Sequence, residues 1–349
     1  MRTNFLIIAG LLALAAPVAA PAQTAISAPN GAWKHDQSGL TLPATVLGIA
    51  RGALADNSRS QIDVMANYEG EATTVTLYVF RPALASVPMW FDRSETMIML
   101  RDVYGGPSAP APAAAFAPPR SKVGSALRRV YMPGKGPYKS TGLAVMPLGE
   151  WLVAVRITSR DTDAAGLGAK MDEVIGTIGW PDGVAEAQPA AVVAPCAAPL
   201  AYAKKAKLKA PDMSDAIFGA LTSSIVDNAV KDDKDKGEAA EKATPVTWCR
   251  EGPATLAFAT YRAVGTESGY TMALGDAGVV IDVNQGLAAL LQKKSGYQLS
   301  LRLLDRTLVY PSFDKLPTPD AALAAVKSAS PVSSVERGSK DVTITTNTK

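Results

Sequence analysis

Two adjacent segments with alternating apolar residues constrain the fold of this chain more than any other feature. Apolar side chains fall on one side of QIDVMANY at 61–68 (Ile62, Val64, Ala66 and Tyr68) and of TTVTLYVFRP at 73–82 (Val75, Leu77 and Val79). Successive side chains of a strand point to opposite faces, so each segment predicts a half-buried strand. The short turn at 69–71 between them predicts a β-hairpin, and therefore an antiparallel sheet.

Further strands and a few helices follow along the chain. In the first half we expect strands at 38–48 and 126–132, a second hairpin around 149–150, and helices at 88–104 and 161–179. In the second half we expect helices at 213–233, 284–293 and 319–329, and strands at 254–262, 269–274, 278–283, 297–304 and 306–310. This succession predicts an α+β protein of two domains, each an antiparallel sheet packed by a few helices.

Composition changes divide the chain into these domains. Residues 23–183 form the predicted N-terminal domain, in which the Pro/Ala-rich stretch 107–119 is expected to be an exposed loop outside any regular ladder. The segment 184–195 lacks large side chains and carries two prolines, as domain linkers do. A C-terminal domain at 196–329 follows, and residues 330–349 predict a loose tail or a marginal edge strand.

The first 22 residues predict export through a signal peptide. An apolar run from Phe5 to Ala16 precedes Ala20-Pro21-Ala22, which fits the small-x-small cleavage pattern. Cleavage near Ala22 would leave a mature chain starting near Gln23, in the periplasm or outside the cell. The apolar run is shorter than the roughly 20 residues of a comfortable span, and an uncleaved anchor is the alternative. After residue 22 we expect no transmembrane segment.

Cysteine usage agrees with an exported protein. Cys196 and Cys249 are the two cysteines of the chain, and both lie in its second half. An even, low count in an exported chain favours one disulfide between them. There is no Cys-x-x-Cys motif for redox chemistry or zinc binding, and a catalytic thiol would need a histidine partner.

Histidine scarcity removes several enzyme classes. His35 is the one histidine in 349 residues, and it lies before the first confident strand, where we expect a surface side chain. Ser-His-Asp and Cys-His catalysis would have to use it. Zinc and most transition metals prefer histidine and cysteine ligands, so we expect no such metal site and no cofactor.

Two loops resemble ligand-binding motifs but lack the residues that those motifs need. GKGPYKSTG at 134–142 has Tyr138 where a phosphate-binding loop requires glycine, and Pro137 removes one N–H donor. We therefore expect a turn that enters a strand. A calcium loop around DDKDKGE would place Lys234 and Lys236 at ligand positions if Gly237 is its sixth residue.

A hydrolase that needs no histidine is the main alternative to a binding protein. Its base could be a lysine beside a serine, and the adjacent pairs are Ser121-Lys122, Lys139-Ser140 and Ser339-Lys340. Paired carboxylates could serve instead, with Asp161/Asp163 and Glu267/Asp276 as candidates. Such an enzyme would need a deep cleft holding a lysine or carboxylate of shifted pKa.

Charge gives one further candidate surface. The formal net charge of +3 over 349 residues predicts no nucleic-acid binding. The one basic cluster, KKAKLK, supplies Lys204, Lys205, Lys207 and Lys209. It could make weak contact with anionic lipid or an acidic partner, which is the third function considered.

The layout of the first half resembles the α/β fold of PsbP-like proteins. The similarity covers residues 33–181, from the early strand at SGLTLP to the closing helix that ends in GTIGWP. It rests on the order of elements, and it implies helices packed on an antiparallel sheet with a binding or assembly role. The sequence as a whole predicts an exported envelope protein that binds an envelope protein or a small apolar ligand and is not a catalyst.

Overall fold

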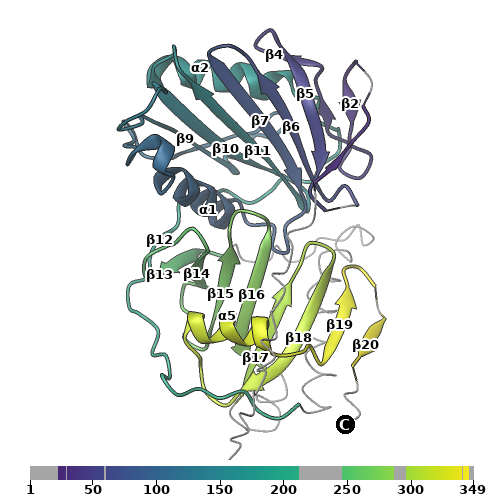
Figure 1. The fold of residues 1–349 in the computed structure, drawn as a ribbon, viewed down its shortest axis with the longest axis vertical. Coiled ribbons are helices and arrows are strands. Elements are labelled where there is room, and N and C mark those ends of the chain that lie inside the picture. Colours follow the sequence, from purple (N-terminus) through teal and green to yellow (C-terminus); the bar gives the residue numbers. More distant parts are fainter. Residues whose placement is uncertain are drawn as a thin grey trace, which may run out of the picture.

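The protein is β-rich, which corrects the expected α+β class. The computed structural model describes residues 23–28, 30–58, 60–211, 246–286, 296–339 and 341–345. Strands hold 39% of these residues and helices 14%. The strands of the described part form two nine-stranded sheets and one two-stranded sheet. The two large sheets lie one above the other in Figure 1.

The first large sheet is antiparallel and contains both predicted hairpins. Its order is β1-β5-β6-β7-β11-β10-β9-β8, with β4 paired to β5. The bounds are β1 Thr24–Ala25, β4 Thr45–Val46, β5 Ile49–Asp56, β6 Asp63–Glu69, β7 Thr73–Phe80, β8 Ala114–Phe116, β9 Ala126–Tyr131, β10 Ser140–Leu148 and β11 Trp151–Ser159. The expected strand at 38–48 is divided into β4 and β3 (Thr41–Leu42), and β3 pairs with β2 (Trp33–Lys34) in the small sheet.

Each face of this sheet is covered by a helix. Helix α2 (Ala164–Thr177) packs on one face through Leu167, Met171, Val174 and Ile175. Its N-cap is Asp163, whose side chain accepts a bond from the amide of Gly166. Helix α1 (Val87–Met99) lies on the other face, between the two large sheets, and η1 (Asp102–Tyr104) follows it (Figure 1).

The second large sheet follows the chain order from β12 to β20. Its strands are β12 Ala194–Pro195, β13 Trp248–Glu251, β14 Phe258–Ala263, β15 Gly269–Leu274, β16 Val279–Gln285, β17 Tyr297–Arg302, β18 Arg306–Phe313, β19 Ser333–Glu336 and β20 Val342–Ile344. All neighbours are antiparallel except β12 and β13. Helix α5 (Pro319–Ser328), capped by Thr318, packs against this sheet through Ala322 and Ala325.

Two segments expected to lie outside the sheets contribute strands. Within 107–119, β8 pairs with β9 at the sheet edge, because Ala114, Ala115 and Phe116 retain the amide donors that the flanking prolines lack. Within 330–349, expected as a loose tail or a marginal edge strand, β19 pairs with β18, and β20 pairs with β19 at the sheet edge. The expected helix at 284–293 begins inside β16, and its remainder and the helix at 213–233 lie outside the described residues.

Helix α1 joins the two sheets through one shared apolar cluster. Trp90 is fully buried in it, together with Leu127 and Val145 of the first sheet and Tyr261 and Val280 of the second. The buried surface of each sheet therefore includes side chains of the other. This contact creates the space in which the candidate site lies.

Candidate functional site

The predicted disulfide is present. Cys196 and Cys249 are bonded, with their Cα atoms 4.8 Å apart. The amide of Cys196 also donates to the carbonyl of Arg250, 3.0 Å away, beside the parallel pair β12–β13. The disulfide therefore fixes the end of the linker segment to the edge of the second sheet.

His35 is buried and not a surface side chain, so that expectation was wrong. It is 0% exposed. Its ring lies between Trp33 and Trp151, with centroids 5.7 and 4.8 Å away. One ring nitrogen meets Ser38 Oγ at 2.7 Å, and Nε2 donates to the carbonyl of Gln61, also at 2.7 Å. Burial lowers the pKa of His35, so a neutral imidazole serves here as a packing and hydrogen-bonding group.

Two serines of the predicted Ser-Lys pairs, Ser140 and Ser121, donate hydrogen bonds to backbone carbonyls. Ser140 Oγ donates to the carbonyl of Thr162 at 2.7 Å, and Ser121 Oγ to that of Val123 at 3.4 Å. Lys340 lies outside the described residues, as do the acids of the DDKDKGE loop. Asp161 and Asp163 are engaged around the start of α2, where Asp161 accepts a bond from Ser159 Oγ at 2.6 Å.

The basic cluster runs alongside β18. Lys204, Lys205 and Lys207 are exposed. The amide of Lys207 donates to Asp314 Oδ1 at 2.7 Å, and that of Lys209 to the carbonyl of Ser312 at 2.8 Å. These bonds involve the backbone, and the side chains of Lys204, Lys205 and Lys207 are exposed at the surface. Weak contact of these side chains with an anionic surface stays a prediction.

A cavity lies between the two sheets. Its volume is about 600 Å³, within the range of small-molecule sites. Strands β7, β10 and β11 and helix α1 form one wall, and the β15–β16 and β17–β18 turns form the other. Its apolar lining includes Phe80, Ile98, Leu143, Ala154, Val279 and Leu304.

Four charged side chains and one phenol line the same cavity: Asp63, Arg101, Arg156, Asp276 and Tyr78. Burial raises the pKa of Asp63 to about 6, and the charges of Asp56 and Asp276 add to the effect, whereas a hydrogen bond from Asn57 opposes it. Burial also raises the pKa of Tyr78, which keeps the phenol protonated, although Arg156 opposes this rise. The charges of Asp63, Asp276, Arg101 and Arg156 all affect the pKa of Tyr78.

Arg156 is the unusual member of this group. Its Nε and Nη2 atoms are buried and have no hydrogen-bond partner among the described residues. Arg81 and Arg250 also have an unpartnered Nε, but each pairs with a carboxylate, Glu150 and Asp92 respectively. Buried guanidinium donors without partners are costly, so their presence beside an open cavity indicates a place for an acceptor from outside the chain.

Polar contacts hold the walls of the cavity together. Arg93 of α1 is 0% exposed and donates to the carbonyls of Gly275, Thr255 and Leu256 at 2.7, 3.0 and 3.3 Å. Next to it, Asp92 accepts bonds from Arg250 and from the hydroxyl of Tyr261, both at 2.6 Å.

A second set of contacts joins the sheets around the β7–α1 connection. Arg337, in the turn after β19, donates to the carbonyl of Pro82 at 2.8 Å and pairs with Glu150 at 3.3 Å. Gly278 has φ +81°, and an added Cβ would lie 3.1 Å from the Cα of Pro82. Its carbonyl accepts a bond from the amide of Ala83 at 2.8 Å.

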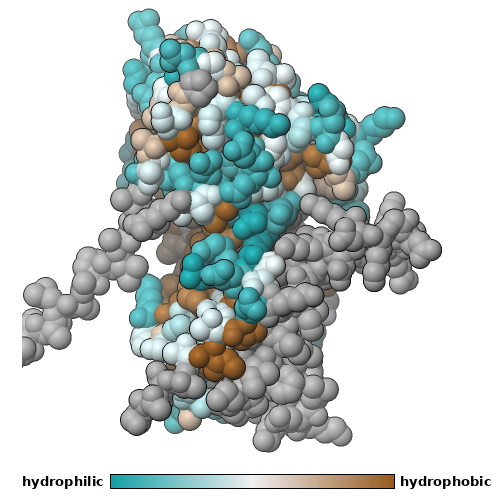
Figure 2. Space-filling model, turned by 90° about the vertical axis from the view of Figure 1, so that its right-hand side faces the viewer, coloured by the Kyte–Doolittle hydropathy of each residue, from teal (hydrophilic) through white to brown (hydrophobic). Residues whose placement is uncertain are grey.

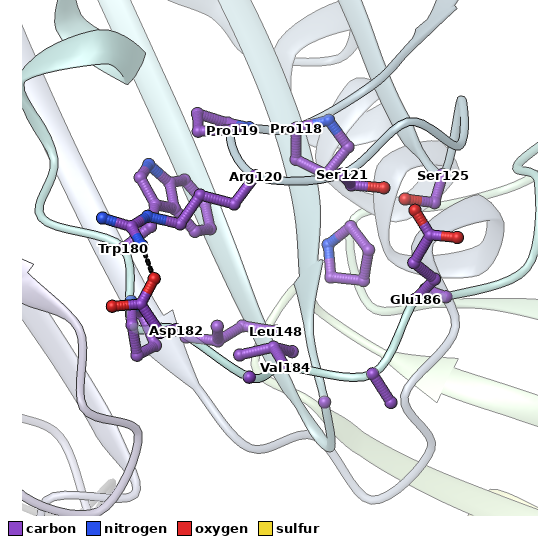
Figure 3. Close-up of a pocket in the computed structure, with 16 residues that line it drawn as sticks. Pro118, Pro119, Arg120, Ser121, Ser125, Leu148, Trp180, Asp182, Val184 and Glu186 are labelled. Atoms are coloured by element: carbon purple, nitrogen blue, oxygen red, sulfur yellow. Dashed lines mark ion pairs between the residues drawn. The ribbon is translucent and has the colours of Figure 1, made fainter.

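A smaller pocket of about 180 Å³ lies between the 118–125 segment and the residues after α2 (Figure 3). Arg120 and Asp182 pair across one side of it, and Ser125 and Glu186 lie on the other. The Oγ of Ser125 is buried without a partner. Its volume and mainly polar rim make it a weaker candidate for a ligand than the cavity between the sheets.

Figure 2 shows hydrophobic residues in separate groups among hydrophilic ones on the described part of one face. Among the described residues, no helix is long and apolar enough to cross a membrane, and no group of three or more His, Cys, Asp or Glu side chains is arranged to hold a metal ion.

No family model, no curated protein and no solved structure matches this chain. The resemblance of 33–181 to PsbP-like proteins therefore stays a prediction. The site has to be interpreted from its own geometry and chemistry.

Most residues that line this cavity were not predicted from the sequence as site residues. Asp276 was a candidate paired with Glu267, but the structure places Asp276 with Asp63. The signal for Arg156 was present, because WLVAVRITS is apolar on both faces up to that single arginine. A cation within such a strand is expensive to bury, and that cost marks it as a functional candidate.

Proposed function

We propose that the protein is an exported, non-catalytic binding protein of the bacterial envelope that holds a small, mainly apolar ligand between its two sheets. The observation that carries this proposal is the cavity of about 600 Å³ shared by both sheets. Apolar walls with a few convergent polar groups are typical of small-molecule sites. Export rests on the first 22 residues and on the disulfide, which suits an oxidising compartment.

A neutral apolar fluorophore tests the binding proposal. Phenylnaphthylamine should bind the wild-type protein with a rise in fluorescence at one site per chain. Ala277→Trp should abolish this signal, because Ala277 lines the cavity from an exposed turn where a large side chain needs no repacking of the core. Ala53→Trp, at an exposed position of β5 away from the cavity, is the matched control and should bind normally. Equal signals in both variants would place the dye elsewhere and contradict the proposal.

The export part has a separate test. The protein isolated from the envelope fraction of its own host should have an intact mass that begins near Gln23 and is two hydrogens lighter than the reduced chain. A mass that includes residues 1–22 would mean that the segment is retained as an anchor.

Acid–base hydrolysis is the second candidate, because the cavity holds two acids and one of them has a shifted pKa. The pKa of Asp63 is about 6, in the range useful for proton transfer, and Asp276 acts on it. A panel of ester, amide and glycoside substrates should give turnover that Asp63→Asn abolishes if this candidate is correct. Turnover that survives Asp63→Asn would have another origin.

A further inference from the structure

We infer that the ligand of the cavity between the sheets carries an acidic group, a carboxylate, phosphate or sulfate, which pairs with Arg156. This inference rests on the proposed binding function and adds the class of ligand. The Nε and Nη2 atoms of Arg156 have no hydrogen-bond partner among the described residues, and Arg156 lines the cavity.

The position of Arg156 explains why the chain itself supplies no acceptor. On β11 it lies directly opposite Thr76 of β7 and Leu143 of β10. Ala154, two residues earlier, shares its face, and Leu143 and Ala154 both line the cavity. Leu143 and Ala154 beside it are apolar, Thr76 has a hydroxyl but no charge, and no ion pair joins Arg156 to a carboxylate among the described residues.

Two other buried arginines of the chain have hydrogen-bond partners for their guanidinium groups. Arg93 donates to three carbonyls, and Arg262 donates to Glu251 at 2.5 Å and to the carbonyl of Thr266 at 2.7 Å. The chain is thus able to satisfy buried arginines within its core. Arg156 differs because its free donors are beside a cavity, and a planar guanidinium is suited to bind an acidic group through two parallel bonds.

Tyr78 and Arg101 supply the surroundings that an acidic group needs. Tyr78 stands two residues along β7 from Thr76, the cross-strand partner of Arg156, so its side chain shares the face of Arg156. Its protonated hydroxyl can donate to an anion. Arg101, exposed at the end of α1, adds a second positive charge to the lining. The apolar wall beyond these groups would hold the hydrocarbon part of the ligand.

Asp63 and Asp276 also line the cavity, and their negative charges would repel an anionic ligand, which provides a second test. The charge of Asp276 contributes to the raised pKa of Asp63. An ionised Asp63 weakens the binding of an anion by repulsion, so neutralising it at pH 7.5 should strengthen that binding.

Ten-carbon probes that differ only in the head group test whether the cavity prefers an acidic ligand. Decanoate, decyl phosphate, decanol and decylamine share one tail and differ in the head, and each can be titrated against bound phenylnaphthylamine. Wild type should bind decanoate or decyl phosphate about ten-fold more tightly than decanol, and decylamine most weakly. The stronger of the two acids would identify the head group that fits.

Variants separate the role of Arg156 from damage to the fold. Arg156→Met should lose the about ten-fold preference for the acid while it keeps the affinity for decanol, and Arg156→Lys should recover part of it. Asp63→Asn should raise the affinity for decanoate at pH 7.5. Arg160→Met, at an exposed position one residue beyond β11, is the control and should change none of these values.

The outcomes distinguish this inference from the proposed function. Equal binding of decanoate and decanol, unchanged by Arg156→Met, would overturn the acidic ligand and leave the apolar binding site standing. That result would mean that water alone satisfies Arg156. Failure of phenylnaphthylamine and of every ten-carbon probe to bind would overturn both.

Discussion

At the scale of residues, the contact between the sheets uses buried charge in two ways. Arg93 and Asp92 are satisfied by carbonyls, an arginine and a phenol of the second sheet, so they stabilise the contact. Arg156 and Asp63 line the cavity, where neither forms an ion pair with another described residue, so the desolvation cost of each is only partly offset. The first pair holds the walls of the cavity, and the second gives the cavity its chemistry.

Arg93→Met should destabilise the protein by about 3 kcal/mol, because it leaves the three carbonyls at Gly275, Thr255 and Leu256 without their buried charged donor. Urea unfolding followed by tryptophan fluorescence measures the loss. Arg160→Met removes an exposed arginine that stacks on Tyr138 and should cost less than about 0.5 kcal/mol. Equal effects of the two substitutions would contradict the role given to Arg93.

Asp63→Asn should change the pH dependence of stability. The folded pKa of about 6 exceeds the ordinary value of 3.8, so the folded state binds the proton more tightly. Wild type therefore loses stability from Asp63 as the pH rises from about 4 to about 6, and the loss is complete above that range.

The asparagine variant lacks this loss, so its stability relative to wild type should improve by about 2 kcal/mol between pH 4 and pH 7.5. Urea unfolding of both proteins at each pH gives the difference between their free energies of unfolding. The contribution of His35 is the same in both proteins, so it does not affect this difference. A difference that stays constant between the two pH values would show that Asp63 is not perturbed.

At the scale of elements, helix α1 and the β12–β13 pair have the largest consequences. Helix α1 begins at a Ser86 N-cap and presents apolar side chains to both sheets, so it belongs to neither one alone. The β12–β13 pair joins the end of the linker segment to the second sheet, and the disulfide closes a loop with a sequence separation of 53. Removing the disulfide therefore acts on the second sheet first.

Replacement of both cysteines by serine should cost about 4 kcal/mol in the chain-entropy description. Hydrogen exchange measured by mass spectrometry should show faster exchange in β12 and β13, with β6 and β7 still protected. The reduced wild-type protein should behave in the same way. Equal deprotection of β6–β7 and β12–β13 would mean that the two sheets do not differ in their dependence on the disulfide.

At the scale of the whole molecule, the two sheets form one connected structure around α1. Arg93, Asp92, Gly278 and Arg337 all join parts of the chain more than 150 residues apart. We expect these contacts to hold the sheets together without the linker segment. The position of the cavity between the sheets depends on this arrangement.

Cleavage of the linker segment tests that arrangement. A protease site introduced at 184–186, where the side chains are exposed, should be cut without separating the halves, which should co-elute in size-exclusion chromatography. The same cut in the Arg93→Met background should let the halves come apart. Separation of the wild-type halves after cutting would show that the contact between the sheets is weak.

The sequence predicted individual strands better than the fold class. The hairpins at β6–β7 and β10–β11 and strand β15 follow from alternation and turn residues that act over a few positions. The α+β class was wrong because short strands, such as the edge strand β8 and the inner strand β19, carry no alternation long enough to recognise. The pairing of β19 with β18 also depends on a partner that lies across helix α5 in the sequence.

The sequence by itself determined the two hairpins, helices α1, α2 and α5, and the disulfide, because each depends on local periodicity or on a choice with one available partner. Only the tertiary structure decided the candidate site. Asp63, Tyr78 and Arg156 come from three strands, and Asp276 comes from the other sheet. Burial and charge act through space, so the free donors of Arg156 and the raised pKa of Asp63 become visible only when the two sheets meet.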